Sequence, residues 1–132
     1  MKDSCNYGFG KTVDLDFSAA VERVRTLLQK QGFAVLSTID LQKDLETALG
    51  ISFRRYLILG ACNPAFAYQA FTADANIGLL LPCNVIVYEG DDGKVRVMAM
   101  DPMHVMELVR KPEAVAVSIE VKEKLEAVIA EL

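Results

Sequence analysis

The sequence predicts an α+β fold: a single domain with an antiparallel-rich sheet and helices packed mainly on one face of it. Three observations lead to this expectation. Strand-like runs rich in β-branched and aromatic residues alternate with amphipathic helical segments. The clearest turn, Gly90-Asp91-Asp92-Gly93, joins two strand-like runs into a hairpin. No linker, repeat or low-complexity segment divides residues 1–132, and this length is typical of one domain.

The first half of the chain predicts strands and helices in alternation. Apolar residues three and four positions apart mark the helices, and Asp40 is placed to begin the second of them. Runs of β-branched and aromatic residues mark the strands. The expected elements are a strand at 7–13, a helix from Phe17 to a stop at Gly32, a strand at 33–39, a helix at 41–49 and a strand at 53–61.

The second half begins with a sharp helix start, because Asn63 can cap a helix whose first turn holds Pro64. The run after Pro82 is continuously apolar, which predicts a central strand covered on both faces. The expected elements are a helix from 64 to about 74, a strand at 84–89, a strand at 95–100, a brief helix from Asp101-Pro102 to Val109 and a long helix from Pro112 to the end.

Composition limits the classes of partner. Fourteen basic against eighteen acidic residues give a net charge of −4, which argues against nucleic acid or an anionic membrane as the main partner. The first residues are polar and no apolar run reaches the roughly 20 residues of a membrane span, so we expect a cytoplasmic protein. Nothing in the composition calls for a cofactor.

The hairpin predicts two sheet faces of different character. A three-residue turn at 91–93 sets Val87 opposite Val97 and Val85 opposite Ala99, which makes one aliphatic face. The reverse face is too apolar to lie in water and too polar for a simple core. It is expected to be a dimer interface or the wall of a ligand pocket, with cover by one of the chain's own helices as the alternative. Its candidate residues are Tyr56, Ile86, Tyr88, Arg96 and Met98.

Two Cys-Asn pairs provide the candidate ligand site. Free backbone N–H groups at the helix start beside Cys62 can hold an anion and can lower the pKa of a thiol. Simple packing of both cysteines is the alternative. A structural metal site wants about four ligands, so no metal is expected, although the single histidine, His104, could activate a thiol. The candidate ligand-binding residues are Cys62, Asn63, Pro64, Cys83 and Asn84.

The familiar catalytic motifs give no support for an enzyme. The sequence lacks the nucleophile elbow, the phosphate-binding loop, the dinucleotide fingerprint and the zinc-protease motif. Whether the protein is an enzyme, and which residues would be catalytic, stays open at this point.

Three segments carry a resemblance to a known family. They are Leu59-Gly60-Ala61-Cys62-Asn63-Pro64, then Gly78-Leu79-Leu80-Leu81-Pro82-Cys83-Asn84-Val85, then Asp101-Pro102. The chain resembles the bacterial and archaeal family called domain of unknown function 302 over nearly its whole length. The resemblance implies a TATA-binding-protein-like topology with the helices at 41–49 and 64–74 inserted, and a homodimer. The family has no established activity, so the resemblance transfers no catalytic residue.

Three hypotheses remain. The leading one is a cytoplasmic homodimer that binds a small anionic ligand near the helix start at Asn63. The second is a thiol-dependent redox or sulfur-handling protein that uses Cys62 and Cys83. The third is an assembly module that binds a partner protein through its reverse sheet face.

Overall fold

The structure is a computed structural model that describes residues 2–132, with side chains from Cys5 onward. Six strands form one sheet: β1 (Lys2–Cys5), β2 (Gly8–Val13), β3 (Ala34–Asp40), β4 (Tyr56–Cys62), β5 (Cys83–Glu89) and β6 (Val95–Met100). The helices are α1 (Phe17–Lys30), α2 (Leu41–Leu49), α3 (Pro64–Ala73), α4 (Pro102–Met106) and α5 (Pro112–Glu131), with a 3₁₀ turn η1 (Ala75–Leu79).

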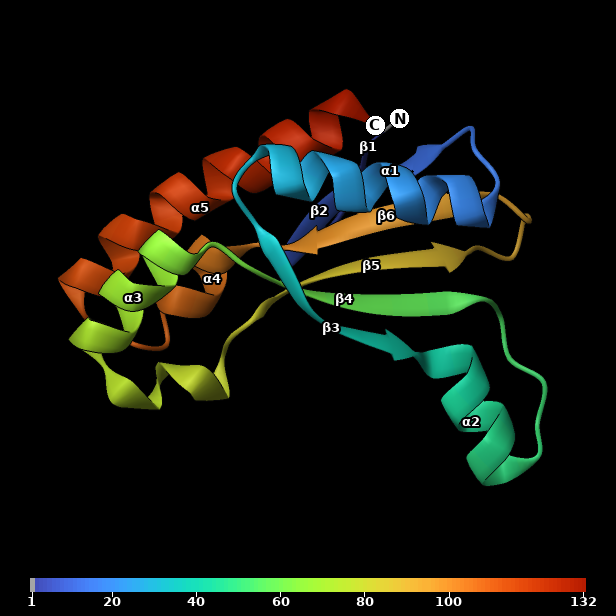
Figure 1. Cartoon of the computed structure of the whole chain (residues 1–132), viewed down its shortest axis with the longest axis horizontal. Helices are drawn as coiled ribbons and strands as arrows, with labels where there is room; N and C mark the ends of the chain where they lie inside the picture. Colours follow the sequence, from blue (N-terminus) through green and yellow to red (C-terminus); the bar gives the residue numbers. More distant parts are fainter. Residues whose placement is uncertain (1) are drawn as a thin grey trace.

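The sheet is antiparallel throughout, in the order β1-β2-β6-β5-β4-β3. Because β4 and β5 each have a neighbour on both sides, they are central strands, and β3 is one edge (Figure 1). The predicted α+β fold and the central place of the 84–89 strand are therefore confirmed. The TATA-binding-protein-like topology stays a prediction.

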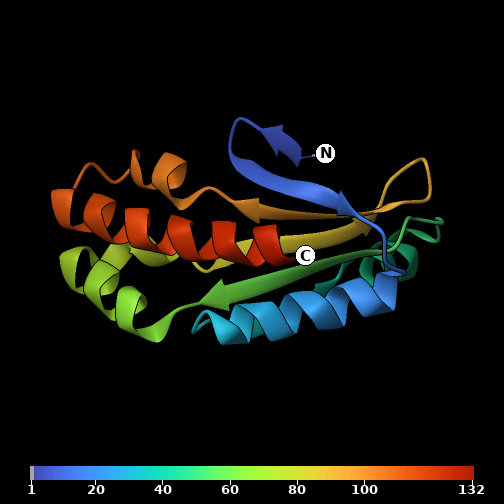
Figure 2. The same ribbon diagram turned by 90° about the horizontal axis from the view of Figure 1, so that it is seen from above.

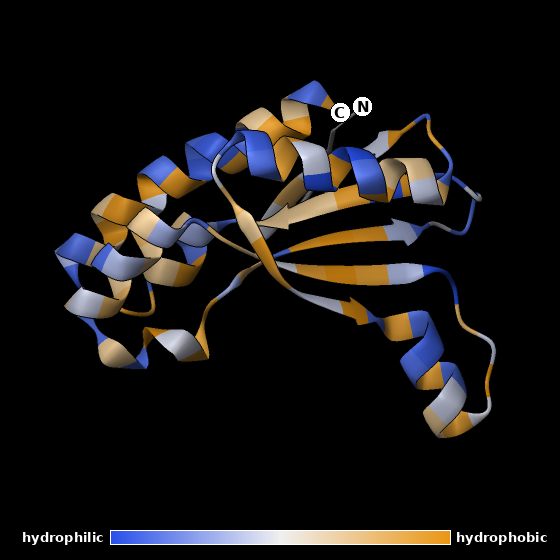
Figure 3. Ribbon diagram, viewed as in Figure 1, coloured by the Kyte–Doolittle hydropathy of each residue, from blue (hydrophilic) through white to orange (hydrophobic). Residues whose placement is uncertain are grey.

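The core lies between one face of the sheet and the helices α1 and α5, which pack side by side along it (Figure 2). Leu28 of α1, Leu125 of α5 and Leu59 of β4 are fully buried there. The strands at the centre are mostly apolar, whereas α1, α2 and α5 alternate apolar with charged residues (Figure 3). Since α1 and α5 both pack along the same face, the predicted packing of the helices mainly on one face is confirmed.

The hairpin between β5 and β6 has the predicted register. Val85 pairs with Ala99, Val87 with Val97, and Tyr88 with Arg96. Gly93 adopts a positive φ of 78°, and the Gly90 N–H donates to the Lys94 carbonyl at 2.8 Å, as expected of a short turn closed by a glycine bulge.

Two differences from the sequence prediction have simple local causes. The strand expected from Phe53 begins at Tyr56, because Phe53 is held by α2: its N–H donates to Glu46 and its carbonyl accepts from Gln42, both at 3.0 Å. Strand β1 was not predicted, because Lys2-Asp3-Ser4 carries no apolar or β-branched signal.

The helix start at Asn63 is also different from the expectation. Asn63 occupies the cap position and Pro64 the first turn, but the Asn63 side chain makes no capping hydrogen bond. By contrast, Asp16 caps α1 and Asp101 caps α4 through their carboxylates. The Asn63 amide is therefore left for another contact.

Candidate functional site

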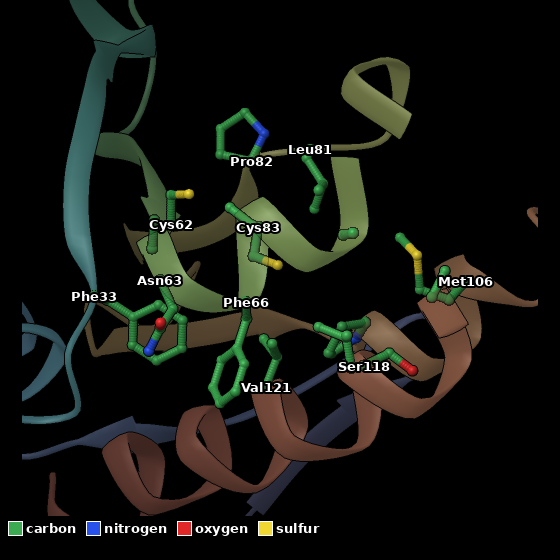
Figure 4. Close-up of a pocket in the computed structure, with 16 residues that line it drawn as sticks. Phe33, Cys62, Asn63, Phe66, Leu81, Pro82, Cys83, Met106, Ser118 and Val121 are labelled. Carbon is green, nitrogen blue, oxygen red and sulfur yellow. The ribbon is translucent and has the colours of Figure 1, made fainter. Parts of the chain in front are cut away.

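A cavity of about 50 Å³ lies where β4 ends and β5 begins, beside α3, α4 and α5 (Figure 4). We call it the corner cavity. A cavity needs roughly 10–15 Å³ to hold one water, so this one has room for a few non-hydrogen atoms. Its lining residues are Phe33, Ala61, Cys62, Asn63, Phe66, Ala67, Ala70, Leu81, Pro82, Cys83, Pro102, Met106, Ala114, Val117, Ser118 and Val121.

Polar groups in the corner cavity are few. The Ser118 hydroxyl already donates to the Val115 carbonyl at 2.6 Å. The Asn63 amide lies over the turn between α1 and β3, since a Cβ added to Gly32 would sit 3.2 Å from its Nδ2. In Figure 4 the Asn63 side chain lies beside Phe33. Asn63 is thus the main polar group that a bound molecule could meet, together with the two thiols.

The two cysteines meet at the corner cavity but face different ways. Cys83 pairs directly with Ala61 across the β4–β5 ladder, and both are buried on the face covered by helices. Cys62 is the last residue of β4 and lines the same cavity from the end of the strand. In Figure 4 the Cys62 sulfur lies near Pro82, whereas the Cys83 sulfur points deeper into the cavity.

The surroundings make both thiols weak acids. Burial raises the pKa of Cys62, and burial, followed by the neighbouring Cys62, raises the pKa of Cys83 to about 12. A helix start can lower a thiol pKa, but here burial raises the pKa of both thiols instead. His104 is exposed on α4 and does not line the cavity, so it does not activate either thiol.

A second, open pocket of about 750 Å³ lies on the reverse face of the sheet, and we call it the open-face groove. No described helix packs on this face of the sheet, so the alternative that one of the chain's own helices covers it is wrong. Its lining residues are Cys5, Tyr7, Gly8, Phe53, Arg54, Tyr56, Ile58, Asn84, Ile86, Tyr88, Arg96, Met98, Ala99 and Met100.

Aromatic rings and arginines give the open-face groove its character. The Tyr56 and Tyr88 rings stack with centroids 5.2 Å apart, and Phe53 lies 6.4 Å from Tyr56. Burial, and then the proximity of Tyr88, raise the pKa of Tyr56. Arg54 and Arg96 are the charged residues of this lining, and each meets an aspartate of the β5–β6 turn, at 2.5 Å for Asp91 and 3.0 Å for Asp92.

Comparison with known proteins places the chain in a family. The family model described as "Domain of unknown function DUF302" matches residues 9–132. The chain belongs to the DUF302 family. A solved structure described as an uncharacterized conserved protein DUF302 from Bacillus stearothermophilus has 22% sequence identity and a TM-score of 0.87. The match covers 96% of this chain and 98% of that one, and at this identity it establishes the fold. No curated protein matches the chain.

The DUF302 fold brings together only part of the predicted ligand site. Cys62, Asn63 and Cys83 line the corner cavity. Pro64 is exposed at the start of α3 and is outside the lining. Asn84 lines the open-face groove instead, because the residue after Cys83 points to the opposite face. The predicted second face is found as a unit: Tyr56, Ile86, Tyr88, Arg96 and Met98 all line the open-face groove.

Several cavity residues escaped the sequence prediction. Phe66, Met106 and Ser118 reach the corner cavity from three different helices, α3, α4 and α5. The spacing of apolar residues on α5 predicted a buried stripe, but not that α3 and α4 would cover its first half. Among residues 2–132 the structure gives no group of three His, Cys, Asp or Glu side chains suited to a metal. No described helix is long and apolar enough to cross a membrane.

Proposed function

We propose that this DUF302 domain binds a small, neutral and largely apolar molecule in the corner cavity. The observation that supports this proposal is the position of the Asn63 amide, which lies at an apolar cavity and does not cap its own helix. Small-molecule sites typically combine an apolar lining with a few polar groups that orient the ligand. An amide offers one acceptor and two N–H donors, so it suits a ligand with a carbonyl, hydroxyl or amide end.

The chemistry of the lining favours a neutral ligand over the anion expected from the sequence. The lining contains no Lys, Arg or His side chain. An ion moved into such surroundings loses its hydration, and a helix start alone compensates for little of that desolvation energy. The raised pKa of Cys83 has the same cause, because burial at the corner cavity also disfavours the negatively charged thiolate. The anionic part of the hypothesis therefore has no support from the lining.

The proposal can be tested with two probes of equal size and different charge. Butyramide and butyrate would be titrated against the protein while thermal stability is followed. We expect saturable stabilisation by butyramide and none by butyrate. Ala67→Leu, which fills the cavity, should abolish the effect, whereas Ala65→Leu, exposed on the same helix, should retain it. No stabilisation by butyramide, or an equal effect in Ala67→Leu, would refute the proposal.

We further propose that the domain acts as a cytoplasmic homodimer. The observation that favours a dimer is the open-face groove, whose aromatic, Met and Arg side chains are typical of protein interfaces. Three free cysteines fit a reducing compartment. Sedimentation equilibrium at micromolar concentration tests the oligomeric state: a dimer is expected, and a monomer contradicts it.

A further inference from the structure

The corner cavity has a half-exposed mouth. Several of its lining residues are partly open to solvent, and they come from two short segments of chain: the junction of β4 with α3, and the loop that leads into β5. These residues are Cys62, Asn63, Phe66, Ala67, Leu81 and Pro82. A molecule therefore enters the cavity between the start of α3 and that loop, beside the Asn63 amide.

The opposite end of the corner cavity is closed. Met106 of α4 is 3% exposed, and Ala70 of α3 and Ala114 of α5 are 5% and 1% exposed. These three side chains belong to a second hydrophobic core cluster. In Figure 4 Asn63 and Met106 lie on opposite sides of the cavity, with Cys83 between them. The cavity is thus a blind pocket, with an amide at its mouth and apolar side chains at its closed end.

Resting on the proposed function, we propose that the corner cavity takes the short, unbranched acyl chain of its ligand tail first, and that Met106 sets the length limit. The carbonyl end then lies at the mouth, where Asn63 offers N–H donors and solvent is within reach. The reverse orientation would bury the carbonyl among Met106 and the alanines, which offer no side-chain donor, and a buried unpaired carbonyl is costly. The nearby Ser118 hydroxyl already donates to the Val115 carbonyl.

The position of the mouth determines which part of the ligand can be large. Substituents on the carbonyl end extend through the mouth into solvent, whereas extra carbons on the tail meet the closed end. At roughly 10–15 Å³ for each water-sized group, a cavity of about 50 Å³ holds about four such groups, which corresponds to a chain of about four carbons. The ligand class is therefore a short acyl group linked through an amide to a larger molecule.

Three neutral amides test this orientation in the wild-type protein by calorimetric titration. Butyramide is the reference, hexanamide lengthens the tail, and N-butyrylglycinamide enlarges the amide end. In a cavity without an end, each added methylene would tighten binding about fourfold. We expect instead that hexanamide binds at least about tenfold more weakly than butyramide, while N-butyrylglycinamide binds within about threefold of it.

Two variants test the length limit. Met106→Ala opens the closed end, so hexanamide should bind at least as tightly as butyramide. Met103→Ala is the matched control, because Met103 lies on the same helix outside the cavity lining, and it should keep the preference for butyramide. Ala70→Val narrows the closed end without removing a large core side chain, and it should weaken butyramide more than propionamide.

The outcomes separate this inference from the proposed function. Hexanamide that binds as tightly as butyramide in wild type, or N-butyrylglycinamide that does not bind, would overturn the inference and leave the binding of butyramide standing. An unchanged preference for butyramide in folded Met106→Ala would also overturn it. Failure of butyramide itself to bind would overturn both.

Discussion

Ala61 lies directly opposite Cys83 in the β4–β5 ladder, and this pairing determines how the two cysteines of the corner cavity are related. Cys83 shares the helix-covered face with Ala61, whereas Cys62, one residue further, lines the cavity from the end of β4. The two cysteines therefore occupy adjacent positions of the ladder, but their side chains point in different directions (Figure 4). The sheet thus makes Cys83 part of the cavity wall.

Oxidation should therefore fail to join these two cysteines. In folded Cys5→Ser protein treated with oxidised glutathione, we expect a mixed disulfide at half-exposed Cys62 and a free thiol at buried Cys83. Intact mass spectrometry under denaturing conditions distinguishes the added glutathione from the loss of two hydrogens that an internal disulfide would cause. A high yield of the internal disulfide in a chain that keeps its fold would contradict the register argument.

The raised pKa of Cys83 predicts a loss of stability at alkaline pH. The pKa of this thiol has its ordinary value of 9.0 in the unfolded chain, and burial raises it to about 12 in the folded chain. Between these values the unfolded chain binds fewer protons, so the free energy of unfolding falls by up to about 1.4 kcal/mol per pH unit. The contribution is complete below pH 9 and is lost as pH rises towards the folded value.

Urea unfolding from about pH 8 to about pH 10.5 measures this effect. The free energy of unfolding of Cys83→Ala should fall less steeply with pH than that of wild type. Cys5→Ser, which changes an exposed thiol, should follow wild type. Parallel curves for wild type and Cys83→Ala would show that Cys83 ionises normally in the folded state.

Asp101 is predicted to stabilise the chain through two kinds of contact. It caps α4 by accepting from the Met103 N–H at 3.0 Å and the His104 N–H at 3.4 Å, and it pairs with Lys122 of α5 at 2.9 Å. Asp101→Ala should lower the free energy of unfolding by about 1–2 kcal/mol. Lys122→Met removes only the ion pair and should cost less. Equal losses in the two variants would mean that the cap contributes nothing.

Gly60 is predicted to be required by close packing at the reverse face. A Cβ there would meet the Ser37 hydroxyl and would lie 2.9 Å from Cγ of Pro82. Gly60→Ala should therefore destabilise the protein by about 1–3 kcal/mol, as overpacking does. Combining it with Ser37→Gly should recover part of the loss, measured by urea unfolding. A neutral Gly60→Ala would show that Pro82 moves away freely.

The sequence predicted best what depends on local chemistry. The Asp-Asp-Gly turn fixed the β5–β6 register, and the register separated an aliphatic face from the face of Tyr88 and Arg96. Gly50 with a φ of 66° ended α2 as expected. In each case the local structure is determined by residues that are close together in the sequence.

What depends on packing between distant segments was predicted less well. The corner cavity needs α3 and α4 to lie across α5, and no local pattern states which helices meet. Asn63 followed by Pro64 is typical of a side-chain cap, yet the Asn63 amide makes no capping hydrogen bond and lies over Gly32 instead. The thiol pKa follows the same rule: burial, a tertiary property, raises the pKa of Cys62 and Cys83, where the helix start alone would lower it.

Binding in the corner cavity can be measured by an NMR titration with butyramide, followed in the amide spectrum of the labelled protein. We expect saturable shifts at Asn63, Phe66, Cys83 and Ser118, and their loss in Ala67→Leu. Shifts confined to the reverse sheet face around Tyr56 and Tyr88, or no saturable shifts at all, would contradict it.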